Sequence, residues 1–285
     1  MFEKRYDGRR VHNIEPFNRI IPYIMKTRTD SQNMFDTEVS CVPLDEYIKL
    51  KREEGLELNY LKIFIAAIVR VIAERPALNR FIMSGRIYTR PKIWVSMAVH
   101  KTLRDDSAET TIKLEFDGTE NISDISEAID KIIAENAHVG ANSTTDNLVN
   151  VIMAIPDFLI RLAVNFLMAI DKINLLPKAV INASPFHTSL FITNLKSLGI
   201  GSIHHHVYEF GTTGLFVALG KEENKVVANK KGEMEVKKML PLGVVTDERF
   251  CDGLYFARSI KLLKKYLTNP ELLETRLEKK VEDVD

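Results

Sequence analysis

The sequence is poor in the features that mark several functional classes. Only two cysteines, Cys41 and Cys251, occur in 285 residues, so we expect no disulfide framework and a reducing, cytoplasmic environment. Basic and acidic residues balance at 39 each, so no net field attracts nucleic acid and we expect no such partner. The first residues, Met-Phe-Glu-Lys-Arg-Tyr-Asp, contain no apolar run, which argues against a secretory signal.

Short catalytic motifs are missing as well. The sequence has no Walker loop, no dinucleotide-binding glycine fingerprint, no CxxC pair and no G-x-S-x-G elbow. It also shows no repeat, no linker and no lipoyl-type module before the core. Hydrophobic residues make up 45%, enough for a sizeable core, and we predict a single domain over residues 1–285.

Helical patterns dominate the first half. Residues 44–54 form a helical stretch that ends at a glycine. Asn59 is a plausible N-cap for a helix over 60–74, which is apolar nearly all round and is therefore expected to be buried. Ser123 is expected to cap a helix that extends to about residue 136 and carries one stripe of isoleucines.

The last third is rich in predicted strands, which favours a mixed α/β sandwich over a doubly wound sheet. A turn at 230–232 joins two of them, a helix follows over 252–267, and residues 1–20 are interpreted as an arm or edge segment. We predict strands over 93–100, 110–117, 178–183, 188–195, 213–220, 225–228, 233–236 and 241–246.

Residues 148–170 are the most hydrophobic segment, and about 20 residues suffice to span a bilayer. However, Asp157, Arg161 and Asn165 form a polar stripe, and Pro156 interrupts the segment. A charge near a bilayer centre costs several kcal/mol. We therefore favour a helix packed on the body or on another subunit, and keep a membrane-surface contact as the alternative.

Four segments, in the right order, carry a resemblance to a known family. The turn at 240–253, ending Phe-Cys-Asp-Gly, resembles the H-x-x-x-D-G signature of chloramphenicol acetyltransferase and of the dihydrolipoyl acyltransferase cores of 2-oxoacid dehydrogenase complexes. Phe191-Ile-Thr-Asn-Leu195 resembles their T-I-S-N-L strand, although Lys196 replaces the glycine expected next. Residues 75–79 with Ser84-Gly85-Arg86, and residues 269–273, are similar to other segments of these cores. The resemblance covers about residues 20–273 and leaves a charged tail over 274–285.

This resemblance implies a chloramphenicol-acetyltransferase-like α/β fold, a mixed sheet with flanking helices, assembled as a trimer. It implies a channel between subunits that CoA, the acyl donor, enters from one end and the acceptor from the other. The family's histidine deprotonates the acceptor, and a neighbour's Ser or Thr hydroxyl stabilises the oxyanion. Thr193 occupies that hydroxyl position, which contributes about 3–4 kcal/mol in comparable sites, although it could be an ordinary strand residue.

The signature aspartate of the family pairs with an arginine and braces the turn. Asp252 matches this aspartate, and Arg28 is the nearest candidate for its partner. Asp252 is equally suited to cap the following helix, where its charge favours the helix dipole.

Glu248 stands where the family carries its histidine. Glutamate, with an ordinary pKa of about 4.3, is a much weaker base than histidine at about 6.5. Against a thiol of about 8.5, the mismatch costs roughly 5–6 kcal/mol unless burial raises the carboxyl pKa. Glu248 is a tuned base, another group supplies the base, or the family chemistry has been lost.

The substitute base is sought first in His204-His205-His206. On a strand, His204 and His206 would share a face and could act as bases or metal ligands. A polar loop is the ordinary alternative, and we predict no metal site. His187 is a weaker candidate, and Cys251 lacks an adjacent base and is read as a packing residue.

The sequence therefore supports acyl transfer from CoA to a thiol, hydroxyl or amine acceptor, with Glu248, Thr193 and Asp252 as the site. No lipoyl group is expected on this chain, so the acceptor is a small molecule or is carried on another protein. The alternatives are a catalytically inactive trimeric or cubic cage scaffold, in which residues 148–170 form a docking surface, and an acyl-CoA-binding protein.

Overall fold

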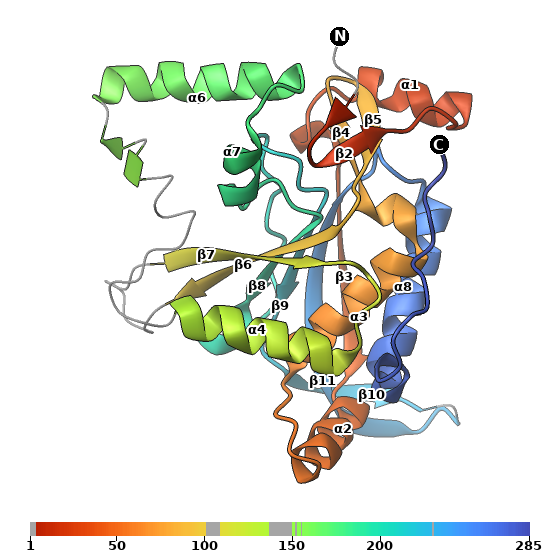
Figure 1. The fold of residues 1–285 in the computed structure, drawn as a ribbon. Coiled ribbons are helices and arrows are strands. Elements are labelled where there is room, and N and C mark those ends of the chain that lie inside the picture. Colours follow the sequence, from red (N-terminus) through yellow and green to blue (C-terminus); the bar gives the residue numbers. More distant parts are fainter. Residues whose placement is uncertain (1–3, 101–108, 137–149, 152, 155, 230) are drawn as a thin grey trace.

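The computed structural model describes residues 4–100, 109–136, 150–151, 153–154, 156–229 and 231–285. Their strands form two sheets, one of seven strands and one of four, with helices packed mainly on one side of the larger sheet (Figure 1). This arrangement confirms the predicted α/β fold with a mixed sheet and flanking helices.

The larger sheet has the order β10-β11-β9-β8-β6-β7, and β3 pairs with β11. β8 runs parallel to both β6 and β9, whereas the other pairs are antiparallel, so the sheet is mixed. Its strands are β3 (Gln32–Ser40), β6 (Ile93–His100), β7 (Glu109–Phe116), β8 (Leu190–Asn194), β9 (Leu215–Leu219), β10 (Glu223–Ala228) and β11 (Met234–Asp247).

The smaller sheet has the order β1-β2-β5-β4 and joins the N-terminal hairpin to a second hairpin. β1 (Lys4–Arg5) and β2 (Gly8–Arg10) come from the predicted arm, which is thus partly a strand pair. β4 (Arg80–Met83) and β5 (Arg86–Thr89) meet at the two-residue turn Ser84-Gly85, where both residues have positive φ. Such a turn matches the twist of a hairpin.

One buried helix anchors the core beneath the larger sheet. α3 (Tyr60–Glu74) begins at Asn59, whose side chain accepts a hydrogen bond from the Lys62 amide, and it is buried nearly all round, as predicted. α4 (Ile122–Asn136) and α8 (Gly253–Thr268) pack against it, and α2 (Val42–Glu53) packs on α8 (Figure 1). The apolar stripe of α4 faces this core through Ile122, Ile125 and Ile129.

The opposite face of the sheet is covered in part by an irregular segment, residues 201–210. A Cβ at Gly243 would lie 2.1 Å from the carbonyl oxygen of Ile203, and one at Gly220 would lie 2.3 Å from the Ser202 amide nitrogen. Glycine at both strand positions therefore lets a second backbone lie directly on the sheet. Val207 then packs with Phe216 in a second, smaller core cluster.

Some local predictions were wrong, each for a physical reason. Residues 178–183 form a helix, α7 (Lys178–Ala183), because Pro177 starts a turn and a short apolar run does not distinguish strand from helix. The strands predicted over 233–236 and 241–246 are one strand, β11. Pro241 is tolerated there because pairing with β10 ends at Met239 and pairing with β9 begins at Leu242. The cap of α4 is Asn121, which exchanges hydrogen bonds with Asp124, instead of Ser123.

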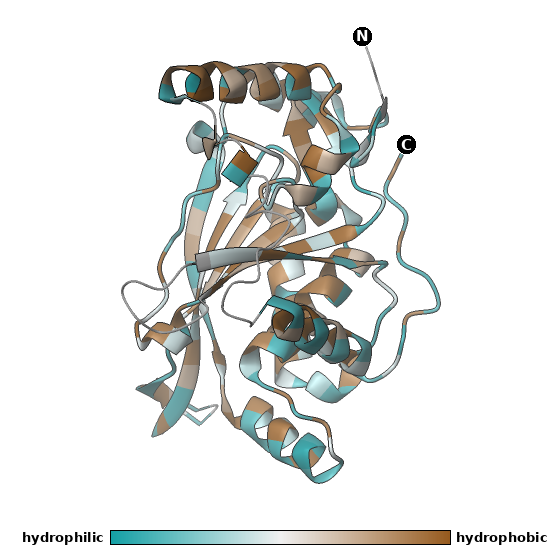
Figure 2. Ribbon diagram, turned by 60° about the vertical axis from the view of Figure 1, so that its left-hand side comes forward, coloured by the Kyte–Doolittle hydropathy of each residue, from teal (hydrophilic) through white to brown (hydrophobic). Residues whose placement is uncertain are grey.

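The most hydrophobic segment contributes a protruding helix, α6 (Asp157–Lys172), at one end of the molecule (Figures 1 and 2). Phe158, Leu162 and Phe166 are more than half exposed along one side. Residues 148, 149, 152 and 155 of the predicted stretch lie outside the described residues. In the parts of the chain that the structure describes, no helix is both long and apolar enough to cross a membrane.

The alternating charges from Glu271 onward are typical of a solvated helix or a frayed end, but residues 274–285, the charged tail, form neither. The tail is instead an extended strap, which we call the C-terminal strap, laid along α3 and the smaller sheet (Figure 1). The Val281 amide donates to the Ala73 carbonyl, and Asp283 forms a bidentate ion pair with Arg80 at 2.6 and 2.7 Å. The Asp283 side chain is only 5% exposed, so these contacts anchor the strap.

Candidate functional site

The turn between β11 and α8 carries the residues that resemble the family signature. Asp252 is the N-cap of α8, and its carboxylate accepts a hydrogen bond of 2.8 Å from the Tyr255 amide. An aspartate here satisfies an otherwise unpaired amide and favours the helix dipole. Asp252 thus has the capping role that was one of its two predicted roles.

The other predicted role of Asp252, bracing by Arg28, is not present in the described residues. Arg28 is buried and donates to three backbone carbonyls, those of Tyr208, Glu209 and Ile82. The bidentate ion pair at this turn is formed by Arg249 and Asp247 instead, at 2.7 to 2.8 Å. The ion pair that stabilises the turn is therefore formed by two residues of the turn itself, which the sequence pattern did not reveal.

Glu248 lies at the start of this turn and is partly buried. Its carboxylate accepts a hydrogen bond of 2.6 Å from the Asn33 side-chain amide, and its own amide donates to the Ser31 carbonyl at 2.9 Å. Arg249 points away toward Asp247 and the Met25 carbonyl, so it does not pair with Glu248. The carboxylate therefore stays available to a ligand on its other side.

A small cavity of about 130 Å³ adjoins Glu248 between the turn and α1 (Pro16–Ile24). Arg80 also lines this cavity, but its guanidinium is neutralised by Asp283 of the C-terminal strap. Asn33 and Arg80 were not predicted as site residues. Their segments carry no catalytic motif, so only the fold brings them to the turn.

Thr193 lies far from Glu248 within one chain. It pairs with Ala218 of β9, which in turn pairs with Gly243 of β11, five residues before Glu248. At about 3.3 Å per residue and 4.8 Å per strand, the two Cα atoms are roughly 19 Å apart. The two residues cannot meet in one chain.

Thr193 is nevertheless placed where a second chain could reach it. Strand alternation puts Thr193 on the same face as Phe191, whereas Ile192 points into the main core beneath α3. The face that carries Phe191 is the one away from α3, and Thr193 is only partly buried on it. A site that combines Glu248 with Thr193 must therefore draw them from two copies.

The three consecutive histidines do not form a strand, contrary to the expectation. His204 lies 3.2 Å from the Asp36 carboxylate of β3, and His205 stacks on Phe216 with ring centroids 4.1 Å apart. Among the residues that the structure describes, no group of three or more His, Cys, Asp or Glu side chains could hold a metal ion. These histidines fasten the irregular segment to the sheet.

His187 and Cys251 have packing roles. His187 is fully buried, with its ring nitrogens 2.8 Å from the Ser184 hydroxyl and 3.1 Å from the Asp171 carboxylate. Burial, with a smaller contribution from Asp252, raises the pKa of the Cys251 thiol to about 12. A thiol that stays protonated at neutral pH is a poor nucleophile.

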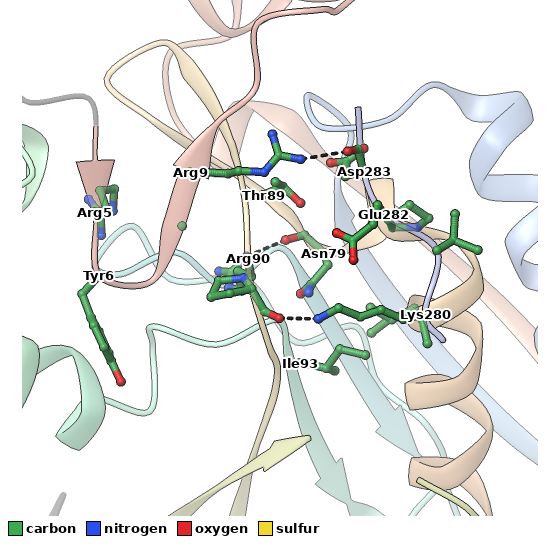
Figure 3. A pocket seen from close by; sticks show the side chains of 16 residues that line it. Arg5, Tyr6, Arg9, Asn79, Thr89, Arg90, Ile93, Lys280, Glu282 and Asp283 are labelled. Atoms are coloured by element: carbon green, nitrogen blue, oxygen red, sulfur yellow. Dashed lines mark hydrogen bonds between the residues drawn. The ribbon is translucent and has the colours of Figure 1, made fainter. Parts of the chain in front are cut away.

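A cavity of about 480 Å³ lies away from the turn, between α3, the smaller sheet and the C-terminal strap (Figure 3). Arg9 donates to the Asp283 carbonyl at 2.8 Å, and Lys280 bonds the Pro91 carbonyl, so the strap closes one side. The Arg90 guanidinium donates hydrogen bonds to backbone carbonyls, including that of Asn79. The basic groups of this cavity are already committed to holding the chain together.

A buried lysine near Trp94 predicts a pH dependence of stability. Burial, reinforced by Arg90, lowers the pKa of Lys113 to about 7, while its ammonium donates to the carbonyls of Ile181 and Ser184. Above pH 7 the unfolded chain holds a proton that the folded chain has lost, so stability should rise with pH. We expect the free energy of unfolding in urea to increase between pH 7 and 8.5, by at most about 1.4 kcal/mol per pH unit.

The Lys113→Met variant should flatten this slope, and an equal slope in both proteins would contradict the assignment. The window stops at pH 8.5 because the raised pKa of Cys251 acts in the opposite sense above it: the unfolded thiol loses its proton first.

One protein-family model matches the part of the chain that carries the candidate site. The family model described as 2-oxoacid dehydrogenases acyltransferase (catalytic domain) matches residues 188–275, which include Thr193 and the turn at Glu248. No curated protein matches the sequence.

Several solved structures share the fold. A probable dihydrolipoamide acetyltransferase from Listeria monocytogenes is 15% identical with a TM-score of 0.57, covering 90% of this chain and 94% of its own. The cubic core of the pyruvate dehydrogenase multienzyme complex is 13% identical with a TM-score of 0.56, covering 92% and 93%. A chloramphenicol acetyltransferase is 11% identical with a TM-score of 0.56, covering 91% and 99%. At these identities the likeness establishes the fold.

Proposed function

Because the chain has the fold of chloramphenicol acetyltransferase and of the dihydrolipoamide acetyltransferase cores, we propose that it is a CoA-dependent acyltransferase whose site forms between copies. The observation that carries the proposal is the separation of Glu248 and Thr193. One chain holds them roughly 19 Å apart, yet Thr193 is only partly buried, on the sheet face away from α3. A homotrimer would bring the Glu248 turn of one copy to the Thr193 strand of the next.

In this site Glu248 accepts the proton of a thiol, hydroxyl or amine acceptor as that atom attacks the acyl-CoA thioester. The Thr193 hydroxyl of a second copy donates a hydrogen bond to the oxyanion that develops on the carbonyl. The tetrahedral intermediate collapses, the carbon–sulfur bond breaks, and the CoA thiolate leaves and takes up the proton. Asn33 holds the carboxylate in place throughout.

The step that demands most of this site is removal of the acceptor proton, since a carboxylate is ordinarily a weaker base than an imidazole. Among the candidate replacements, His187 is buried in its own network, and His204 and His205 contact the sheet. His206 is exposed, with its ring against those of His205 and Tyr208, and is the remaining alternative to Glu248 as the proton acceptor. With Glu248 as the base, an acceptor that needs little activation is favoured.

The alternative function is a non-catalytic assembly, favoured by one observation: the turn keeps its shape through Asp247, Arg249 and Asp252, none of which requires an imidazole. Such a protein would keep the trimer, or a cubic cage, and would use the exposed side of α6 as its docking surface. An acyl-CoA-binding protein without turnover is the intermediate case. Both free cysteines, Cys41 and Cys251, suit a cytoplasmic setting for any of these roles.

Two measurements test the proposal together. Light scattering in solution gives the mass and separates a monomer, a trimer and a cage. Incubation with acetyl-CoA and longer acyl-CoA donors, with thiol, hydroxyl and amine acceptors, then follows the release of free CoA thiol. We expect a trimer that accelerates CoA release with at least one acceptor. A trimer that binds CoA without turnover supports the non-catalytic alternatives, and a monomer that does not bind CoA contradicts all three.

A further inference from the structure

A second cavity, of about 290 Å³, lies near the Glu248 turn. Arg249 lines both this cavity and the 130 Å³ cavity beside Glu248. Its walls come from the Ser84-Gly85 turn, the C-terminal end of α6, residues 26–28 and residues 209–211. The Ser84 hydroxyl donates to the Lys172 carbonyl at 2.8 Å, which fixes the hairpin turn to α6. Four segments distant in sequence thus enclose one space.

The charges around this cavity do not balance. Asp171 is already neutralised by Arg5 at 2.8 Å, and Glu209 spends one carboxylate oxygen on the amide and hydroxyl of Thr29. The charged side chains that line it are four cations, Lys26, Arg28, Lys172 and Arg249, and two carboxylates, Asp171 and Glu209.

Three of the four cations lack a carboxylate within ion-pairing distance in the described part of the chain. Arg28 is only 5% exposed, and every hydrogen bond that it makes goes to a backbone carbonyl. Lys26 and Lys172 are exposed at the rim, and neither ammonium has a hydrogen-bond partner among the described residues. Arg28 interacts electrostatically with Asp247, Glu209 and Asp171, but Asp247 is paired with Arg249 and Asp171 with Arg5. Lys26, Arg28 and Lys172 therefore outnumber the one remaining carboxylate, Glu209, and this excess of positive charge favours a bound anion.

The 480 Å³ cavity beside the C-terminal strap does not have this excess of positive charge. There Arg5 pairs with Asp7, Arg9 is held by the strap, and the acidic Glu282 and Asp283 line the same space. An unpaired positive excess therefore distinguishes the cavity beside the turn.

We propose that the cavity bounded by Lys26, Arg28 and Lys172 is a binding site for a small organic or inorganic anion carrying a phosphate or carboxylate group. The two rim lysines would meet the anion as mobile point charges, while Arg28 supplies a fixed charge at the base. This site goes beyond acyl transfer and does not depend on it, because binding is measured without CoA.

Isothermal titration calorimetry on the full chain at low ionic strength tests this, with inorganic phosphate in one arm and succinate in the other. We expect saturable binding in at least one arm, weakened at least tenfold by the paired substitution Lys26→Gln and Lys172→Gln. Both lysines are exposed and make no structural bond through their ammonium groups, so the variant should fold. The arm with the higher affinity identifies the anionic group.

The matched control is Lys261→Gln with Lys264→Gln, two exposed lysines of α8, which removes the same net charge elsewhere. This control should bind within about twofold of the wild type. Equal weakening by both variants would reduce the effect to general surface charge and overturn the site, as would an absence of binding in both arms. Competition by CoA against bound phosphate would identify the phosphates of CoA as the anion.

Discussion

The Glu248→Gln variant is expected to lower CoA-dependent acyl transfer by about 100-fold or more, the usual contribution of a positioned general base. Glutamine keeps the size of the side chain and can still bond Asn33, so the turn should keep its shape. The loss should therefore appear in kcat, with CoA affinity and oligomer mass unchanged. Steady-state kinetics with calorimetric titration of CoA measures both quantities.

The control for this experiment is Glu127→Gln on α4, an exposed glutamate far from the turn, which should leave turnover unaltered. A companion variant, Glu248→His, restores the family's imidazole and should raise turnover toward thiol acceptors, because its pKa is better matched to them. Unchanged turnover in the Gln variant would remove Glu248 from the mechanism. If neither the wild type nor the Glu248→His variant shows CoA-dependent turnover, the non-catalytic scaffold is favoured.

The Asp7→Asn variant is expected to destabilise the fold by about 3–5 kcal/mol, the range for removing one partner of a buried ion pair. Asp7 is fully buried and bonds Arg5 through both oxygens, at 2.8 and 3.1 Å. Burial opposes ionisation of this carboxyl, but the charge and hydrogen bonds of Arg5 hold the pKa of Asp7 below its usual value. Arg5 also reaches Asp171, which bonds His187.

This network joins the N-terminal hairpin to the end of α6 and to the segment before β8, so the loss should be cooperative. Urea denaturation at pH 7 measures it, with Asp124→Asn as the comparison, because the Asp124–Arg276 pair lies near the surface and should matter by less than about 1 kcal/mol. Equal effects of the two substitutions would show that the buried pair contributes no more than a solvated one. Since folding lowers the pKa of Asp7, its contribution to stability should be fully present above the unfolded value of about 3.9 and should be lost as the pH falls through the lower folded pKa.

Much of the fold could be predicted from the sequence because the strongest patterns in the sequence are local ones. Asn59 capped α3, and the apolar character of that helix all round predicted its burial. The errors fell where tertiary context decides. Residues 178–183 are too short and too apolar for the sequence to distinguish strand from helix. Pro241 suggests a break between two strands, because the sequence does not show that the partner of β11 changes from β10 to β9 at this proline.

The candidate site was predicted less completely. The turn at Glu248 and the strand at Thr193 were found from their motifs, and the family match covers both. Arg28 was assigned to Asp252 although it serves backbone carbonyls, since an arginine's partner depends on the path of loops such as 207–210. Lys26, Lys172 and Asn33 carry no motif, so only the folded chain could bring them to the turn.

The C-terminal strap bears on the order of events during synthesis. Within this sequence residue 283 leaves the ribosome more than 200 positions after Arg80, and domains fold as their residues emerge. Until then Arg80 has no carboxylate beside it, and the cavity behind α3 stays open on one side. The charge of Arg80, which lines the cavity beside Glu248, is therefore compensated only after residue 283 has been made.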